Sequence, residues 1–353
     1  MQSPKLRAIV IILAVVIAAL AVYEFYPPTK KPPPVGAFLY LWYGYNSTSH
    51  EWTGGLGTSH WNDTASGTVI DRPAIGYYAS LNNNTLHYQL SNMKQAGISV
   101  VVVSWWGTGN ATQSGKDATL DGAINSATLN LFRYLEANGT NKDPWQFKVA
   151  IMVEPFNRTY DMAPHDYAKL YGYLYDHYYH PYSDLMLGWQ GRPLLLSFNA
   201  PWHGYGVDFQ SGRLPSNSTF TYRLVGANPN PFDWNFWTGM SSQFLDSYGG
   251  TAEPWNYEHA PNVSSDGEVG IAPRYDDFAF RQNYMRFDYM LTQGMYSAEW
   301  SYVLAQKNVS LILIYSWNEY HERTAIEPHW DATAQVGPNC LLNLTAKYVA
   351  MFG

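Results

Sequence analysis

The sequence contains one cysteine, Cys340, among 353 residues. This excludes an intrachain disulfide, a cysteine-based metal cluster and a redox-active cysteine pair. Charged residues make up only 14% of the chain, whereas an ordinary soluble domain has about 25%. The net charge is −7 and the sequence has no basic block, which argues against nucleic acid as a partner. No short-period internal repeat and no second globular domain are visible.

Aromatic residues are abundant at 16%, with 29 Tyr and 14 Trp. Flat aromatic rings suit the apolar C–H faces of sugars, so this composition is compatible with a carbohydrate ligand. The same rings can also fill a hydrophobic core, and most of them are expected to do so.

The N-terminus predicts export. Lys5 and Arg7 precede an apolar run over residues 8–23, which we interpret as a signal anchor or signal peptide over residues 1–25. A proline-rich spacer follows over residues 26–34, and residues 35–353 form the globular part. We therefore expect a single-pass membrane protein with this domain outside the cell, or a secreted protein if the N-terminal segment is cleaved. The domain is expected to be monomeric.

Glycosylation sequons support the same placement. The N-x-S/T pattern occurs ten times, and it serves as an acceptor only in an exported chain. The alternative is a chain that is merely rich in Asn, Ser and Thr. The sequons begin at Asn46, Asn62, Asn83, Asn110, Asn138, Asn157, Asn217, Asn262, Asn308 and Asn343.

Apolar strand patterns alternate with helical patterns along the globular part. This alternation is typical of βαβ units, and the length fits an α/β fold of the (β/α)8 barrel type. Strands are predicted over residues 35–43, 98–106, 147–153, 193–198, 222–226 and 268–272, with a closing strand from residue 311. Helices are predicted over residues 85–96, 118–137, 165–179 and 283–306, and an aromatic loop over 229–240.

Each predicted strand is followed by aromatic or acidic residues. The carboxyl ends of parallel barrel strands meet on one face, so these residues are expected to gather there as a site. They are Tyr40, Tyr43, Trp105, Trp106, Glu154, Trp202, Asp276, Asp277, Glu319 and Glu322.

The stretch 311–330, LILIYSWNEYHERTAIEPHW, shows this change most clearly. Glu319 and Glu322 would point to opposite faces of a continuing strand. If the chain curls into a turn near Asn318, positions i and i+3 come to the same side, about 5–6 Å apart at Cβ. Two carboxyl groups about 5–5.5 Å apart suit a retaining glycosidase. The alternative is that both glutamates are solvated loop residues.

Five stretches that together span most of the globular part are distinctive. The most specific is SWNEYHERTAIEP at 316–328, and the others are YLWYG at 40–44, GYYAS at 76–80, AGISVVVVSWWG at 96–107 with VEPFNR at 153–158, and PRYDDFAFR at 273–281. These stretches resemble glycoside hydrolase family 99, the endo-α-1,2-mannosidases and their bacterial relatives.

The resemblance implies a (β/α)8 barrel and a retaining enzyme that needs no metal or other cofactor. It implies that Glu319 acts as a base on the sugar 2-hydroxyl, giving a 1,2-anhydro intermediate, and that Glu322 is the general acid and base. Further residues are expected to hold or surround the glycan. These substrate-binding residues are Tyr40, Tyr43, Trp105, Trp106, Glu154, Arg281, Asn318 and His321.

The chain also departs from the family. Tyr320 and Arg323 stand where the family usually has Trp and Gly, Gln282 follows Arg281 where Pro is usual, and residues 226–267 align poorly. The chemistry is therefore better supported than the choice of glycan. Arg281 or Arg323 could lower the pKa of one of the two acids.

Several residues have two interpretations. His321 could be a metal ligand, but the absence of a second His at i+4 favours a hydrogen-bonding role. Trp105 and Trp106 are adjacent, so at most one faces the site if the strand continues. Glu327 is interpreted as a loop residue.

Two other functions remain open from the sequence. One is a barrel glycosidase with a direct covalent nucleophile, in which Glu154 and Glu319 are the carboxylate pair. The other is a non-catalytic surface protein that binds glycans, which the low charge and the many aromatic residues allow.

Overall fold

The computed structural model describes most of the globular part of the chain. The described residues are 32–61, 69–109, 118–139, 146–154, 167–198, 219–226, 233–235, 263–264, 266–276, 279, 286–287 and 295–352. Residues 33–352 form one compact unit by their internal contacts. The predicted anchor over 1–25 lies outside the described residues, as does the predicted spacer up to residue 31. No helix within the described ranges has the length and hydrophobicity needed to cross a membrane.

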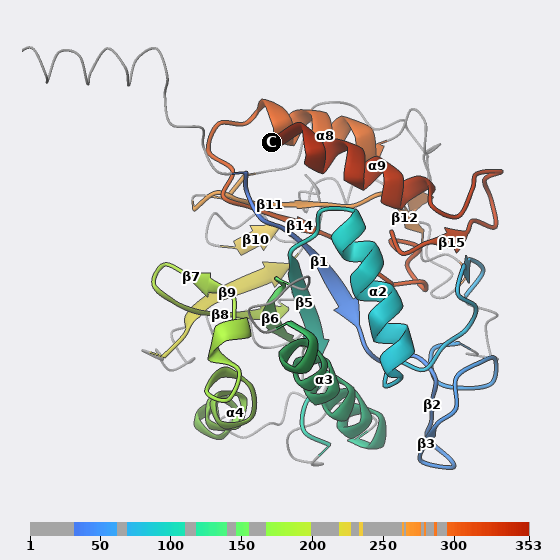
Figure 1. Ribbon diagram of the computed structural model, residues 1–353, viewed down its shortest axis with the longest axis vertical. Helices are drawn as coiled ribbons and strands as arrows, with labels where there is room; N and C mark the ends of the chain where they lie inside the picture. The colour runs from blue at the N-terminus through green and yellow to red at the C-terminus, as the bar shows by residue number, and fades with distance from the viewer. Residues whose placement is uncertain are drawn as a thin grey trace, which may run out of the picture. The chain divides into compact units, whose positions relative to one another are not determined.

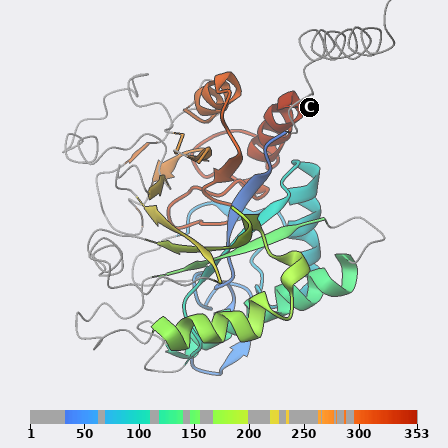
Figure 2. The ribbon, with the colours of Figure 1, turned by 90° about the vertical axis from the view of Figure 1, so that its left-hand side faces the viewer.

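A curled, mainly parallel sheet forms the centre of a mixed α/β fold (Figures 1 and 2). Its hydrogen-bonded strand order is β10-β9-β8-β6-β5-β1-β14-β11, and the short β7 pairs antiparallel with β8. The strands are β1 (Val35–Tyr40), β5 (Val100–Trp105), β6 (Lys148–Val153), β7 (Gly188–Trp189), β8 (Arg192–Phe198), β9 (Thr221–Gly226), β10 (Asp233–Asn235), β11 (Glu268–Ile271) and β14 (Leu311–Ile314).

The order of the strands in the sheet follows their order along the chain. Starting from β1, each parallel neighbour is the next parallel strand in sequence as far as β10, and β11 and β14 lie on the other side of β1. The first and last of these strands pair directly, with Val35 opposite Ile312 and Ala37 opposite Ile314. A barrel requires such pairing between the two ends of the strand sequence. Within the described residues the hydrogen-bonded path stops at β10 and β11, although these two strands are in contact.

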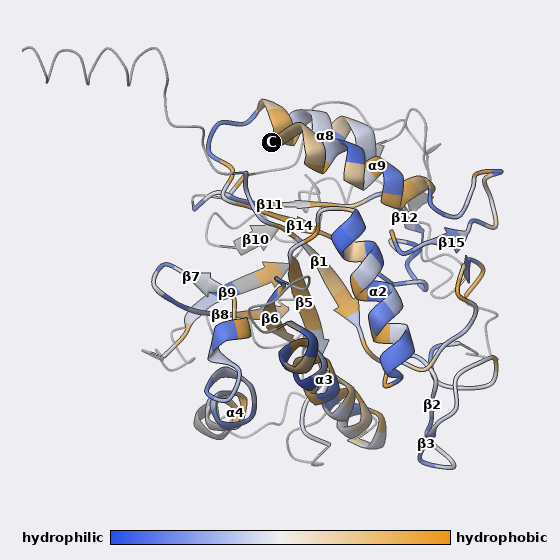
Figure 3. Cartoon of the chain, in the orientation of Figure 1, coloured by the Kyte–Doolittle hydropathy of each residue, from blue (hydrophilic) through white to orange (hydrophobic). Residues whose placement is uncertain are grey.

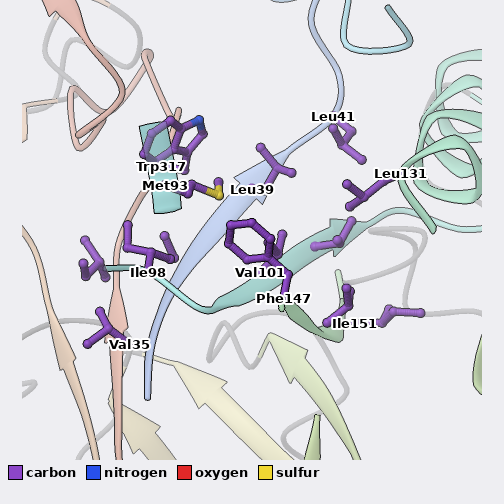
Figure 4. Close-up of a cluster of buried hydrophobic side chains, with 14 of the residues drawn as sticks. Val35, Leu39, Leu41, Met93, Ile98, Val101, Leu131, Phe147, Ile151 and Trp317 are labelled. Atoms are coloured by element: carbon purple, nitrogen blue, oxygen red, sulfur yellow. The ribbon is translucent and has the colours of Figure 1, made fainter. Parts of the chain in front are cut away.

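The two faces of the sheet bury separate hydrophobic clusters because successive side chains on a strand point to opposite faces. The outer cluster includes Ala37 and Leu39 of β1 and Val101 of β5, which pack beneath the helices. Figure 4 shows part of this cluster, including Met93 of α2 and Trp317. The inner cluster includes Phe38 of β1 and Val102 of β5, as expected for a filled barrel interior.

Helices cover the outer face of the sheet (Figures 1 and 2). Strands β1 and β5 are largely hydrophobic, whereas α2 and α3 also carry hydrophilic residues (Figure 3), because only one side of each helix meets the sheet. The α-helices are α2 (Asn83–Gln95), α3 (Ala118–Gly139), α4 (Tyr167–Leu174), α8 (Met295–Ala305) and α9 (Cys340–Val349). A π-helix (Tyr175–Tyr179) continues α4, and 3-10 turns cover Ser183–Leu185 and Ala350–Phe352.

Short antiparallel pairs lie outside the main sheet. They are β2 (Tyr45–Asn46) with β3 (Glu51–Trp52), β4 (Arg72–Pro73) with β15 (His329–Trp330), and β12 (Tyr275–Asp276) with β13 (Arg286–Phe287). The β4–β15 pair joins the loop after β14 to the segment before α2.

Two sequence predictions are wrong in detail. The long helix predicted over residues 283–306 contains strand β13, and the helix described there, α8, starts at Met295. The predicted loop over 229–240 contains β10, whose three residues are too few to produce a recognisable strand pattern.

Candidate active site

The loop that follows β14 carries both predicted catalytic glutamates, Glu319 just before a turn and Glu322 within it. The strand ends at Ile314, and residues 320–323 form the turn. The amide of Arg323 donates to the carbonyl of Tyr320 at 3.3 Å, and the amide of Thr324 donates to that of Glu319 at 3.1 Å. The predicted turn is therefore confirmed, and it removes Glu319 and Glu322 from strand geometry.

Asn318 attaches this turn to the end of β1. Its Oδ1 accepts from the amide of Tyr40 at 2.8 Å, and its Nδ2 donates to the Tyr40 carbonyl at 2.9 Å. Its own carbonyl accepts from the Tyr43 hydroxyl at 2.8 Å. Asn318 is fully buried, so these bonds satisfy groups that have no access to water. It is placed to orient the turn, not to contact a sugar.

Glu319 is held within its own turn. Its amide donates to Ser316 Oγ at 2.7 Å, and its Oε1 accepts from the amide of His321 at 2.9 Å. His321 Nδ1 also lies 3.4 Å from Oε1. Only 4% of Glu319 is exposed. Among the described residues, no group of three potential metal ligands is present, and the observed contacts of His321 are those of a hydrogen-bonding partner of Glu319.

Glu322 accepts a hydrogen bond from the hydroxyl of Tyr315. Tyr315 is the first residue after β14, and its side chain belongs to the inner cluster with Phe38 and Tyr40. Burial raises the pKa of Tyr315 well above its ordinary value, and the charge of Glu322 raises it further. The phenol therefore keeps its proton at neutral pH and remains a donor to Glu322.

Glu154 brings a third carboxyl group to the same place. It follows β6 on the inward side, and its Oε1 accepts from Ser104 Oγ at 2.7 Å. Burial raises the pKa of Glu154 to about 8, and the negative charges of Glu322 and Glu319 also raise it, against the hydrogen bond from Ser104. Because three acids influence one another here, at least one is expected to hold a proton at neutral pH.

Half-buried aromatic rings lie beside these acids. Trp42 lies 4.6 Å from Tyr40, 5.8 Å from Trp106 and 4.5 Å from His60, measured between ring centroids. Trp106 Nε1 donates to Ser104 Oγ at 3.0 Å, which links this ring to Glu154. Sequence reasoning missed Trp42 and His60 as part of the site, although Trp42 lies within the motif at 40–44.

Two residues predicted to contact a sugar, Trp105 and Tyr43, are packed in the protein interior. Trp105 is fully buried in the outer cluster, and its Nε1 donates to Asn125 Oδ1 at 2.8 Å. Tyr43 is also fully buried, and its ring stacks on Trp61 at 4.0 Å. Both side chains support the fold, so their assignment as substrate-binding residues is corrected. Arg281 lies outside the described residues.

Arg323 pairs with a group of buried aspartates. Its guanidinium contacts Asp71, Asp276 and Asp331 at 3.0–3.1 Å. Arg274 joins the same group through Asp71 at 2.6 Å and through an ion pair with Asp331. Arg323 has a φ of 53°, a conformation that glycine adopts freely, at the position where the resembled family usually has glycine. The buried ion pairs hold the larger residue there.

Glu327, interpreted from the sequence as a loop residue, is fully buried. Its carboxylate accepts hydrogen bonds from the hydroxyls of Tyr78 and Tyr320 at 2.9 and 2.8 Å. The signal that could have revealed it is its position between the apolar Ile326 and Pro328, in the run TAIEP.

Comparisons with known proteins identify the fold. No family sequence model and no curated protein sequence matches the chain. Similar solved structures include the GH99 endo-alpha-mannosidase from Bacteroides thetaiotaomicron in complex with bis-tris propane, at a TM-score of 0.62 and 17% identity over 90% of this chain and 96% of that chain. A second structure of a GH99 endo-alpha-mannosidase from the same organism has a TM-score of 0.60 and 18% identity, over 90% and 97%. A glycoside hydrolase-like protein has a TM-score of 0.52 and 14% identity, over 91% and 95%.

These similarities extend over nearly the whole of both chains. The chain therefore has the fold of a glycoside hydrolase. The particular fold is that of the GH99 endo-alpha-mannosidases, which confirms at the level of structure the resemblance found in the sequence.

Proposed function

We propose that the protein is a retaining glycoside hydrolase that cleaves α-mannosidic linkages of glycans, similar to an endo-α-1,2-mannosidase. The observation that carries this proposal is the grouping of three buried carboxyl groups, Glu154, Glu319 and Glu322, at the carboxyl ends of β6 and β14. Similarity to GH99 endo-alpha-mannosidase structures supports the choice of substrate. The proposal includes closure of the sheet between β10 and β11 into a complete (β/α)8 barrel.

In this proposal Glu319 is the base on the sugar 2-hydroxyl. The oxygen of that hydroxyl attacks C1, the bond from C1 to the leaving oxygen breaks, and a 1,2-anhydro sugar forms. Glu322 gives its proton to the leaving oxygen. In the second step Glu322 takes a proton from water, the water oxygen attacks C1, the bond from C1 to the 2-oxygen breaks, and the 2-oxygen recovers its proton from Glu319. Two inversions at C1 give net retention.

The local contacts suit these roles. The hydrogen bond from the amide of His321 holds the carboxyl group of Glu319, the proposed base, in place. Glu322, the proposed acid, lies near Glu154 and accepts a hydrogen bond from the buried Tyr315. Trp42 and Trp106 supply half-buried rings on which a sugar can stack.

The test is to incubate the full-length chain with a panel of α-mannose oligosaccharides, to determine the products by mass and to determine their anomeric configuration by NMR. Shortened oligosaccharides with the anomeric configuration retained support the proposal. A matched substrate lacking the 2-hydroxyl separates it from the alternative with direct attack by a Glu154–Glu319 pair, because direct attack does not need that hydroxyl. Binding of the panel without any product would instead indicate a glycan-binding protein.

Export and membrane attachment are separate proposals that follow from the N-terminal sequence. Treatment of protein from an exporting host with a peptide N-glycosidase should reduce its mass. An unchanged mass would show that the sequons are not used, and would remove their support for export.

A further inference from the structure

A buried carboxylate lies directly behind the catalytic turn. Glu327 has no exposed surface. Its Oε2 accepts from Tyr320 and Tyr78 at 2.8 and 2.9 Å, and its Oε1 accepts from Gln89 Nε2 at 3.1 Å. These donors come from the turn itself, from the segment before α2 and from α2. Glu327 therefore connects the turn that carries Glu319 to the helical layer outside the sheet.

The hydrogen bonds run in one direction. The hydroxyl of Tyr78 has one proton, which it donates to Glu327, and it then accepts from Asn318 Nδ2 at 3.0 Å. With Nδ2 turned to Tyr78, Asn318 Oδ1 is turned to the amide of Tyr40. The Tyr40 backbone fixes the orientation of the Asn318 amide, and a carboxylate can only accept, so the charge of Glu327 matches the one direction in which Tyr78 can link the two residues. A neutral acid or an amide at residue 327 would offer a donor to Tyr78 and disturb that order.

The other titratable groups around Glu327 are neutral near pH 7. Burial raises the pKa of each surrounding phenol and lowers that of the imidazole. Burial raises the pKa of Glu327 itself to about 7, against the hydrogen bonds from Tyr320, Tyr78 and Gln89. These neighbouring groups are Tyr43, Tyr78, Tyr88, Tyr320 and His329. Glu327 is thus the group here that changes charge across neutral pH.

We propose that Glu327, in its carboxylate form, is a positioning residue for the catalytic turn, and that it acts through Asn318 and Tyr320, the residues on either side of Glu319. Without the carboxylate the turn remains folded but holds Glu319 in a less productive position. This inference rests on the proposed glycosidase function.

The test compares Glu327→Gln with the wild-type chain at pH 6 and pH 8. Glutamine resembles the protonated acid, so at pH 6 the wild-type kcat should exceed the variant kcat by no more than about threefold. At pH 8 it should be about 10 to 100, the size of effect expected from a small misplacement of a catalytic group. KM should change by less than about threefold. A merely structural contribution would give a ratio that does not depend on pH.

Glu268→Gln is the matched control. Glu268 is equally buried but lies at the amino end of β11, and neither of its carboxylate oxygens has a hydrogen-bond partner among the described residues. Its substitution should leave kcat unchanged at both pH values. Tyr78→Phe breaks the same link between Glu327 and Asn318 and carries the test if Glu327→Gln does not fold. In the double variant Glu327→Gln/Tyr78→Phe, the fold loss in kcat should be smaller than the product of the two single-variant losses.

Amide hydrogen exchange separates this inference from the proposed function. At pH 8, amides of residues 316–324 should exchange at least about tenfold faster in Glu327→Gln than in the wild type or in Glu268→Gln, whether or not the chain cleaves a glycan. If the wild type shows no hydrolysis but this exchange difference is present, the proposed function fails and the positioning role stands. Equal exchange, or a pH-independent kcat ratio, would overturn the inference.

Discussion

Replacement of Glu154 by Gln is expected to stabilise the fold at high pH. Only 5% of Glu154 is exposed, and the two nearby acids Glu319 and Glu322 oppose its ionisation. Glutamine has nearly the same shape and can still accept the hydrogen bond from Ser104. It cannot ionise, so it removes the cost of placing a third negative charge in this site.

The sign follows from the pKa. In the folded chain the pKa of Glu154 is raised from 4.5 to about 8, so the folded state holds a proton that the unfolded state releases. The contribution of this proton to the free energy of unfolding is fully present below pH 4.5 and is lost as pH rises through about 8. At about 1.4 kcal/mol per pKa unit the loss is on the order of 3 to 5 kcal/mol. Because Glu154 interacts with two other acids, we expect a loss near the lower figure.

Urea unfolding of the wild type, Glu154→Gln and the exposed control Glu51→Gln at pH 5, 7 and 9 measures this effect. The free energies of unfolding should agree within about 1 kcal/mol at pH 5. At pH 9 Glu154→Gln should be more stable than the other two by on the order of 3 kcal/mol. A difference that stays constant between pH 5 and pH 9 would refute the conclusion that burial keeps Glu154 protonated.

Four further substitutions test the scaffold and the site. Asn318→Ala removes both bonds to the Tyr40 backbone and should lower the free energy of unfolding by about 2–4 kcal/mol in urea titrations; a loss below 1 kcal/mol would contradict its anchoring role. Arg323→Gly relieves about 1–2 kcal/mol of left-handed strain but removes the cation that bridges Asp71, Asp276 and Asp331, at a cost of about 3–5 kcal/mol. It should therefore lower Tm, and a raised Tm would contradict this balance. Trp105→Ala should lower the free energy of unfolding by about 3–5 kcal/mol and leave kcat largely unchanged. Trp106→Ala should mainly lower kcat/KM. If unfolding and kinetic measurements gave the opposite pattern, Trp106 would be the core residue and Trp105 the site residue.

Much of the strand framework was predictable because buried parallel strands leave strong local patterns. The run at 98–105 contains four consecutive valines between a helix-ending glycine and Trp105, and it forms β5. The alternation of strands and helices predicted the α/β class in the same way. Strand β10 was missed because three residues carry no period, and its place in the sheet depends on pairing with β9.

The candidate site was predictable in part. Side-chain alternation places Ser104 inward and Trp105 outward, so the expectation that the two adjacent tryptophans differ is confirmed. The roles of Tyr43 and Glu327 were not accessible, because each depends on partners more than 230 residues away, such as Asn318 for Tyr43 and Tyr78 for Glu327. No local pattern records contacts of that kind.

Hydrolysis of an α-mannose oligosaccharide panel by the full-length wild type, Glu319→Gln and Glu322→Gln, with products determined by mass and folding checked by circular dichroism, tests the central claim most directly. The wild type should release shortened glycans, and each variant should lose at least about a thousandfold in rate while remaining folded. A folded variant of either glutamate that cleaves at close to the wild-type rate would contradict the account.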